Sequence, residues 1–305
     1  MANEIWTIKR CLEWTKEYLA ERGEEHPRLS AEWLLCAATG LARIDLYMRM
    51  DETLNAAQLE TMHTAVVRRA KGEPLQYITG STQFRMIDVA CAPGVLIPRP
   101  ETEMLVEEVL NYLDAEVLSP EAAARQRVEL PWNDEVEQAR KAEAALADER
   151  ATAERRAANL TAADEAALGS DALGLTSDEV AFSLTNLVSS IPREEWGTFD
   201  VLVSNPPYIP TDVMRSLPHE VKDFEPDLAL EGGADGLDIF RRLLNAAPYM
   251  LRAGGLFACE LYEGTLDAAA ELCRQAGLSD VRIVHDLTDR PRIVRAIVTE
   301  PKQRQ

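Results

Sequence analysis

Apolar side chains recur at helical spacing through the first 70 residues of the chain, and no strand-like alternation interrupts them. We expect Ser30 to cap a second helix over residues 31–39 that ends at Gly40, and Asn55 to begin a further helix. The pattern therefore predicts a helical domain over residues 1–71. Its first apolar stripe consists of Ile5, Ile8, Leu12, Tyr18 and Leu19.

The pattern changes between residues 72 and 100, where Gly and Pro separate short segments of β-forming side chains. Two apolar runs within residues 83–97 predict a β-hairpin with its turn at residues 92–94. We interpret residues 72–100 as a hairpin linker between two domains. After this linker the apolar spacing is helical again over residues 101–113.

Residues 119–169 differ in composition from the rest of the chain. They are rich in Ala, Glu and Arg and contain few β-branched side chains. A helix that is polar on all sides does not dock firmly on a sheet. We therefore predict a solvent-exposed helical insert, or a poorly ordered one, inside a C-terminal domain of residues 101–305. It should be open to proteases and without chemistry of its own.

Strand-like and helix-like segments alternate in the C-terminal part. The predicted helices cover residues 238–251 and 266–276, the second ending at Gly277. This alternation predicts an α/β domain that binds its ligands at the carboxyl ends of the strands. The predicted strands are residues 180–184, 199–204, 255–261, 281–286 and 293–299.

Composition narrows the classes of function. Acidic residues outnumber basic ones 52 to 32, for a formal net charge of −20. Proteins that bind nucleic acid obtain much of their affinity from Lys and Arg, so we expect no direct nucleic-acid binding. The five cysteines contain no CxxC pair and the four histidines no ligand-like pair, so we expect reduced thiols and no metal site. Without a secretory signal or a run of about 20 apolar residues, a cytoplasmic protein is expected.

One motif carries recognisable chemistry. The apolar strand Phe199–Ser204 leads directly into Asn205, Pro206, Pro207 and Tyr208. The two prolines remove two backbone donors, and the side-chain oxygen of Asn205 and the carbonyl of Pro206 can each accept a hydrogen of a planar NH₂ group. The Tyr208 ring can pack against the plane of such a group. The alternative is that the same residues form only a turn.

Methylation is the reaction that this loop suits. An amide nitrogen is a poor nucleophile because its lone pair is delocalised into the carbonyl. Fixed acceptors for its two hydrogens favour the electron-richer, pyramidal nitrogen and aim it at an electrophilic methyl group. Positioning and electrostatics, without a strong general base, then supply the rate.

Several separated segments together resemble the bacterial peptide chain release factor N5-glutamine methyltransferases. The similarity covers residues 1–114 and 180–295, with the segments in the family's order. The segments are residues 72–80, 95–103 (which include Arg99, Pro100, Glu101, Thr102 and Glu103), 205–210, 224–226, 232–238 and the strand from Gly254 to near Glu260.

The resemblance implies a helical N-terminal domain that recognises the substrate and a Rossmann-like methyltransferase domain that uses S-adenosyl-L-methionine. It implies that Asn205, Pro206, Pro207 and Tyr208 hold the glutamine of the Gly-Gly-Gln motif of release factors, the expected partners. Asn205 is also expected to touch the methyl-donor end of the cofactor. Asn186 and Leu187 stand where the family usually has Gly-Asp near the adenine.

The chain departs from the family in its cofactor segment. Between Leu113 and Val180 there is no GxG sequence, and the only glycines are Gly169 and Gly174. The family uses a strand, a glycine-rich turn and a ribose-binding acid there. A degenerate paralogue, a segment lost from the chain and an unrecognised replacement strand are three explanations. We predict that this chain binds S-adenosyl-L-methionine weakly or not at all.

Other functions remain as alternatives. A ribosomal-protein glutamine methyltransferase shares the same loop chemistry, and so does an amino-methylating DNA enzyme, which the acidic charge disfavours. From a different class comes a catalytically silent paralogue that still binds release factors, which the missing glycine-rich segment favours.

Overall fold

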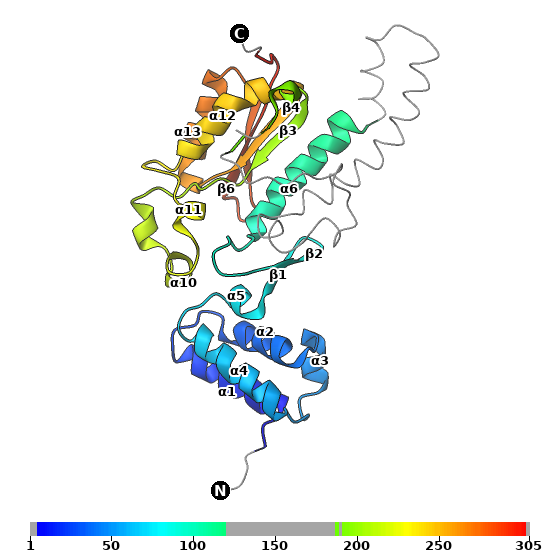
Figure 1. Cartoon of the computed structure of the whole chain (residues 1–305), viewed down its shortest axis with the longest axis vertical. Helices are drawn as coiled ribbons and strands as arrows, with labels where there is room; N and C mark the ends of the chain where they lie inside the picture. The colour runs from blue at the N-terminus through cyan, green and yellow to red at the C-terminus, as the bar shows by residue number, and fades with distance from the viewer. Residues whose placement is uncertain (1–4, 120–186, 189–190, 303–305) are drawn as a thin grey trace, which may run out of the picture. The chain divides into compact units, whose positions relative to one another are not determined.

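The computed structural model describes residues 5–119, 187–188 and 191–302. The chain divides into two compact units. Figure 1 shows the whole chain coloured by residue number from the N- to the C-terminus. One unit contains Met1–Thr82, Ala90–Ile97 and Leu217–Pro226, and the other contains Gln83–Val89, Pro98–Ser216 and Asp227–Gln305. The domain boundaries at residues 71 and 100 remain a proposal.

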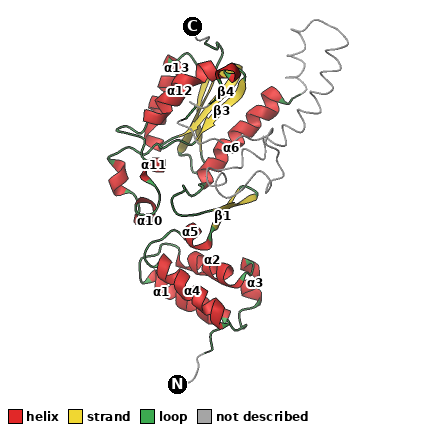
Figure 2. Ribbon diagram, in the orientation of Figure 1, coloured by secondary structure: helices red, strands yellow, loops and turns green. Residues whose placement is uncertain are grey.

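The N-terminal unit is built from helices, as predicted. Its core is formed by the apolar faces of the first four helices, with Ile8, Leu34, Leu35, Leu46 and Val66 fully or almost fully buried. Figure 2 shows these helices together, without a sheet among them. The helices are α1 (Ile8–Ala20), α2 (Pro27–Thr39), α3 (Arg43–Met48), α4 (Ala56–Arg69), α5 (Leu75–Thr79) and the short α10 (His219–Lys222).

The ends of these helices follow their capping residues in two of three predicted cases. Asn55 begins α4 with a capping box, in which its side chain and that of Gln58 each accept the other residue's backbone N–H. Gly40 ends α2 with a left-handed φ of 71°. The prediction for Ser30 was wrong, because α2 already begins at Pro27, a residue suited to the first helical position. Ser30 is buried within α2 and donates to Glu24 Oε1 at 3.0 Å.

The segment 217–226 is tied to this helical unit by charge. Arg69, at the end of α4, lies 2.6 Å from Glu24 and 2.8 Å from Glu220 of α10. A second link is the backbone N–H of Ile97, which donates to Glu225 Oε2 at 3.3 Å. Distant parts of the sequence therefore complete the N-terminal unit.

A two-stranded hairpin does occur in the predicted linker, but its turn lies elsewhere. The hairpin consists of β1 (Ser81–Phe84) and β2 (Ile87–Ala90), joined at Arg85 and Met86. Arg85 adopts a φ of 52°, the left-handed conformation that a tight hairpin turn requires. The prediction of a turn at residues 92–94 was wrong, because those residues follow β2 and form a separate turn of their own.

The second unit is an α/β structure built on a mixed sheet, which confirms the predicted fold class. Its strands are β3 (Phe199–Ser204), β4 (Leu251–Glu260), β5 (Ser279–His285) and β6 (Pro291–Ile297), in the order β3-β4-β6-β5. β3 and β4 are parallel, whereas β6 is antiparallel to both β4 and β5. Among the described residues β3 pairs with β4 alone, and Val203 of β3 is 44% exposed.

Helices cover both faces of this sheet (Figures 1 and 2). Leu256 and Ala258 of β4 pack with Leu105 and Val109 of α6 (Pro100–Tyr112). The intervening Phe257 belongs to the opposite core, with α12 (Asp238–Met250) and α13 (Leu266–Gln275). Alternate residues of a strand face opposite sides, so β4 is buried on both. Shorter helical segments are η1 (Leu113–Val117), η4 (Arg193–Glu195), η5 (Val213–Ser216), α11 (Asp227–Leu230) and η6 (Glu263–Thr265).

The predicted C-terminal elements match the structure with small shifts at their ends. β3 has the predicted bounds, and β4 begins four residues before the predicted start at Gly255. The predicted strand at residues 180–184 and, apart from Ser119, the predicted insert at residues 119–169 lie outside the described residues. In the part of the chain that the structure describes, no helix is both long enough and apolar enough to cross a membrane.

Candidate functional site

Strand topology brings Asn205 and Glu260 to the same edge of the sheet. Parallel pairing of β3 with β4 sets Ser204 opposite Cys259. The next residue of each strand path is therefore Asn205 on one side and Glu260, the last residue of β4, on the other. Carboxyl ends of parallel strands are the usual place for ligand-binding groups in such sheets.

A third element reaches this edge from the start of α6. Arg99 and Pro100 begin that helix, which places Thr102 in its first turn. Asn205 Nδ2 donates to Thr102 Oγ1 at 3.0 Å, and Thr102 Oγ1 donates to Glu260 Oε2 at 2.7 Å. The Tyr208 hydroxyl donates to Glu260 Oε1 at 3.0 Å. We call Asn205, Thr102, Glu260 and Tyr208 the Glu260 network.

Burial sets the electrostatics of this network. Glu260 is only 2% exposed, and this burial raises the pKa of its carboxyl above the ordinary glutamate value. Hydrogen bonds from Thr102 and Tyr208 favour the ionised form and lower that pKa in part. Burial, followed by the charge of Glu260, raises the pKa of Tyr208, so its phenol stays a neutral donor. The carboxylate thus accepts two hydroxyl groups inside the protein.

The loop that carries Asn205 rests on a glycine-rich segment. Ile209 donates its N–H to Leu230 O at 2.9 Å, and Gly232 donates its N–H to Ile209 O at 2.9 Å. A Cβ on Gly232 would lie 2.7 Å from Tyr208 Cα, closer than real Cβ atoms approach. A Cβ on Gly236, whose φ is 75°, would run into the carbonyl oxygen of Tyr208. The two glycines therefore allow the close approach that holds the loop.

The predicted loop residues lie together at the sheet edge. Pro206 is buried, and Asn205, Pro207 and Tyr208 are half-buried. The Tyr208 ring packs against the apolar core of the second unit while its hydroxyl reaches Glu260. No hydrogen bond among the described residues uses Asn205 Oδ1, an amide oxygen that can accept one.

Of the two predicted adenine contacts, Asn186 and Leu187, the structure describes only the second. Asn186 lies outside the described residues. Leu187 has a left-handed φ of 58° and packs against the core on the side of the sheet covered by α12 and α13. Its contact with a cofactor stays a prediction.

Sequence reasoning assigned no role to Thr102 or Glu260. Thr102 was noticed only as part of a similar segment, and Glu260 only as the end of a strand. The available signal was the polar residue at the carboxyl end of an apolar strand, because Glu260 follows a run of buried side chains. Buried carboxylates are rare unless they are paired or functional.

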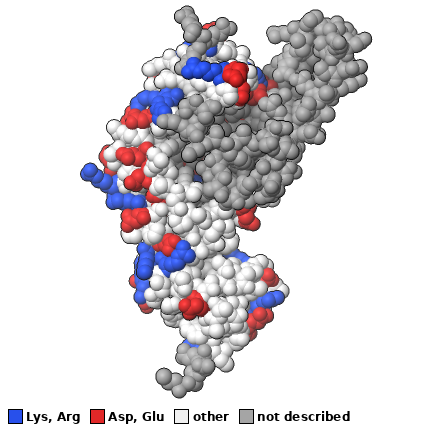
Figure 3. Space-filling model, viewed as in Figure 1, with Lys and Arg blue, Asp and Glu red and all other residues white. Residues whose placement is uncertain are grey.

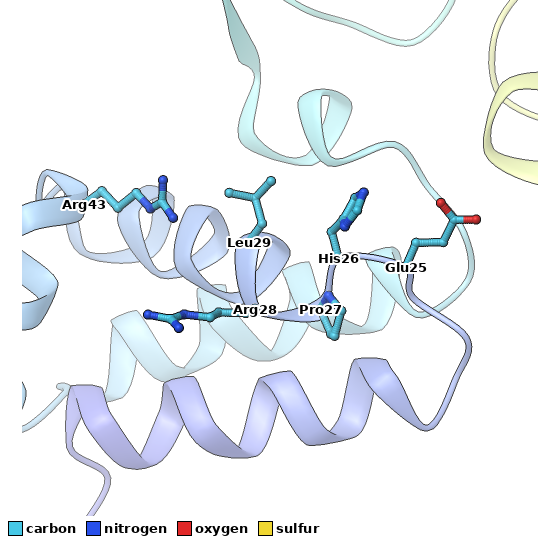
Figure 4. A pocket seen from close by; sticks show the side chains of 6 residues that line it. All are labelled: Glu25, His26, Pro27, Arg28, Leu29 and Arg43. Carbon is cyan, nitrogen blue, oxygen red and sulfur yellow. The ribbon is translucent and has the colours of Figure 1, made fainter. Parts of the chain in front are cut away.

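The structure also has an open pocket in the N-terminal unit, about 410 Å³ in volume. Figure 4 shows its lining residues at the start of α2 and near α3, and none of them belongs to the Asn205 loop. They are Glu25, His26, Pro27, Arg28, Leu29 and Arg43. Arg28 and Arg43 both pair with the buried Glu32, whose single negative charge balances one of their two positive charges.

Comparison with known proteins gives a consistent result. Residues 10–80 match the family model described as the PrmC N-terminal domain. A release factor glutamine methyltransferase from Geobacter sulfurreducens is 38% identical over 298 residues, which cover 95% of this chain and 96% of that protein. One from Caulobacter vibrioides is 35% identical over 296 residues, covering 94% and 96%. One from Moorella thermoacetica is 38% identical over 275 residues, covering 89% and 91%. With the loop at Asn205 in place at the sheet edge, the chain belongs to the release factor glutamine methyltransferase family.

Proposed function

We propose that this protein transfers a methyl group from S-adenosyl-L-methionine to the side-chain amide nitrogen of the glutamine in the Gly-Gly-Gln motif of peptide chain release factors. The observation that carries the proposal is the hydrogen bond from Asn205 Nδ2 to Thr102, which leaves Asn205 Oδ1 as an acceptor at the sheet edge. An oxygen in that place suits an NH₂ group as ligand.

The residues of the loop would act by binding and orientation. Asn205 Oδ1 accepts one hydrogen of the glutamine amide, and the carbonyl of Pro206 accepts the other. Held in this way, the nitrogen lone pair is directed at the methyl group. The Glu260 carboxylate already accepts hydrogen bonds from Thr102 and Tyr208, and we give it no role in removing the amide proton.

The described residues do not by themselves form a site for S-adenosyl-L-methionine, the donor that the family implies. Family members use a glycine-rich turn and a ribose-binding acid, both of which would fall within residues 114–186. The sequence there contains only two separated glycines, Gly169 and Gly174. The buried acid of the described sheet edge, Glu260, is occupied by two hydroxyl groups of the protein. S-adenosyl-L-methionine is therefore included in the proposal only because the family implies it.

Two other substrates or roles are consistent with this loop. A ribosomal-protein glutamine would fit the same acceptors, since the loop recognises only the amide. A catalytically silent paralogue that binds release factors is favoured by the absence of a GxG sequence between Leu113 and Val180. Both alternatives keep a glutamine-bearing protein as the partner and are consistent with a cytoplasmic protein. The net charge of −20 disfavours nucleic acid as the substrate, and Figure 3 shows basic and acidic residues interspersed on the described part of the face in view.

The test is methylation of a purified release factor by the full chain, at micromolar and millimolar S-adenosyl-L-methionine. Mass spectrometry should find one added methyl group on the glutamine of the Gly-Gly-Gln motif. A release factor with that glutamine replaced by alanine serves as the control. Methylation of ribosomal protein alone would favour the first alternative. Binding of the release factor without methylation at any donor concentration would favour the silent paralogue.

A further inference from the structure

Two residues outside the loop, Thr102 and Glu260, are linked to the Asn205 side chain by hydrogen bonds. We infer that Thr102 and Glu260 are positioning residues that fix the side-chain amide of Asn205 with Oδ1 toward the substrate and Nδ2 toward the protein. The inference rests on the proposed function and extends it, because it assigns roles to two residues outside the loop. It is carried by two hydrogen bonds, of 3.0 Å from Asn205 to Thr102 and of 2.7 Å from Thr102 to Glu260.

The direction of these bonds follows from the chemistry of the groups. An ionised carboxylate can only accept hydrogen bonds, so the Thr102 hydroxyl must donate its single hydrogen to Glu260. Thr102 Oγ1 then has only lone pairs left for Asn205. Only Nδ2 of Asn205 can donate to them, so Oδ1 must point away from Thr102. The assignment of the amide atoms thus rests on the network as a whole.

Without this constraint the side-chain amide of Asn205 can rotate so that Oδ1 and Nδ2 exchange places. Turned by 180°, it presents Nδ2 to the substrate NH₂ group, a donor against a donor. That orientation places two like hydrogen-bond donors together and loses the acceptor that holds the nitrogen. The hydroxyl of Thr102 and the charge of Glu260 therefore select the productive orientation by acting on Asn205.

Protonation of Glu260 would remove the selection, because a carboxylic acid can donate to Thr102 and free the threonine hydrogen for Asn205 Oδ1. The groups that face Glu260 come from three elements. Glu101 in the first turn of α6 and burial both favour the protonated form. Arg292 of β6 and the two hydroxyl donors, Thr102 and Tyr208, favour the ionised form. The orientation of Asn205 should accordingly depend on pH.

Kinetic variants test the inference in the full chain. Thr102→Val keeps the shape of the side chain but removes the hydroxyl, and Thr102→Ser keeps the hydroxyl. We expect Thr102→Val to lower kcat by about tenfold, the factor that one net hydrogen bond supplies, with little change in KM for the release factor. Thr102→Ser should retain most of the rate, and Glu260→Gln should act in the same direction as Thr102→Val.

A matched control is available in the same unit. Thr265 is 9% exposed, and its Oγ1 donates to Tyr262 O at 2.8 Å, away from Asn205. Thr265→Val also removes a largely buried threonine hydroxyl, but it should leave kcat unchanged. A loss of rate in Thr102→Val alone therefore reports on the link to Asn205 and not on stability in general.

A second readout does not depend on activity. In chain labelled with ¹⁵N at asparagine, the side-chain NH₂ signal of Asn205 is identified by its loss in Asn205→Ala. This signal should shift with pH in the wild type, with a midpoint above the ordinary glutamate value of about 4.3. The shift should persist in Thr102→Ser and disappear in Thr102→Val and Glu260→Gln.

The possible outcomes separate the two hypotheses. An Asn205 signal that does not respond to pH in the wild type overturns the inference, and so does an unchanged kcat in Thr102→Val. If the wild type methylates no release factor, the proposed function fails, and the NMR titration alone decides whether Thr102 and Glu260 position Asn205. If Thr102→Val does not fold, the same two measurements on Glu260→Gln decide it.

Discussion

At the scale of single residues, the site depends on which atoms remain available after the protein has satisfied its own groups. Thr102 occupies Nδ2 of Asn205 and leaves Oδ1. Glu260 accepts a hydrogen bond from the hydroxyl of Tyr208 and thereby holds this last residue of the motif in place. The chemistry that the loop can perform is therefore decided by residues that the motif itself does not contain.

Asn205→Ala should abolish most of the methylation while leaving the fold intact. The side chain is half-buried, and Thr102 is its hydrogen-bond partner among the described residues, so its removal costs about 1 kcal/mol of stability. Loss of the acceptor should lower the rate of methyl transfer by about a hundredfold or more, as removal of a preorganised group does in other enzymes. Rates and thermal unfolding are measured on the same preparation. Near-normal methylation by the variant would show that the loop has been misinterpreted.

Glu260→Gln should change stability in the direction opposite to its effect on activity. Because the pKa of Glu260 is raised in the folded state, the folded protein binds more protons than the unfolded one between the ordinary and the raised pKa. Stability then falls as pH rises through this window, and the ionised, buried carboxylate destabilises the fold at neutral pH. Urea unfolding at pH 4 and pH 7 should show that glutamine is favoured relative to glutamate more strongly at pH 7. Parallel pH dependence in both proteins would contradict the assignment.

At the scale of elements, the strand and the loop were predictable and the network was not. β3 could be recognised from six consecutive residues, and Asn205 follows it directly. The partners of Asn205 and Thr102 lie 103 and 158 residues away in the sequence, respectively. No local pattern encodes such a contact, because it arises from the pairing of β3 with β4 and the docking of α6. The two wrong predictions have local causes. Helix α2 begins at Pro27 and not after Ser30, and Arg85, with its left-handed φ, forms the turn of the hairpin.

Gly236→Ala tests how the glycine-rich segment supports the loop. A Cβ there meets the carbonyl oxygen of Tyr208 and also forces a side chain onto a φ of 75°. Gly277→Ala is the matched control, because its φ is 86° but no atom lies within 4 Å of the added Cβ. The control should lose about 1 kcal/mol of stability from the backbone alone. Gly236→Ala should lose clearly more than that and also lower the rate of methylation, since the loop must move.

Unfolding free energies and methylation rates of the two variants are compared directly. Equal losses of stability with equal rates would mean that the contact with Tyr208 does not position the loop. A larger loss in Gly236→Ala without any effect on the rate would limit its role to stability.

At the scale of the whole molecule, the sequence identified both the family and the main departure of this chain from it. The helical unit, the α/β unit and the loop are present and correspond to the relatives over nearly the whole chain. Between α6 and β3, however, the sequence contains no GxG of the kind that the resemblance leads us to expect. Among the described residues β3 has one neighbouring strand, β4, on one side only. The proposed substrate loop can thus be recognised in the sequence, whereas a glycine-rich cofactor turn cannot.

The chain should bind S-adenosyl-L-methionine weakly or not at all. Affinity for this ligand depends on a backbone turn near its methionyl part and on an acid at its ribose, and the sequence supplies neither in recognisable form. Two lost charge-assisted hydrogen bonds, at about 1.5–3 kcal/mol each, lower the affinity by about two to four decades. The contacts expected for Asn205 and Leu187 involve only the two ends of the ligand and would not compensate for this loss. Isothermal titration of the folded chain should therefore show no micromolar binding, and methylation should require millimolar donor. A micromolar Kd with one-to-one stoichiometry would instead mean that residues 114–186, with Gly169 and Gly174 first to be replaced, form a turn of a kind that the sequence does not reveal.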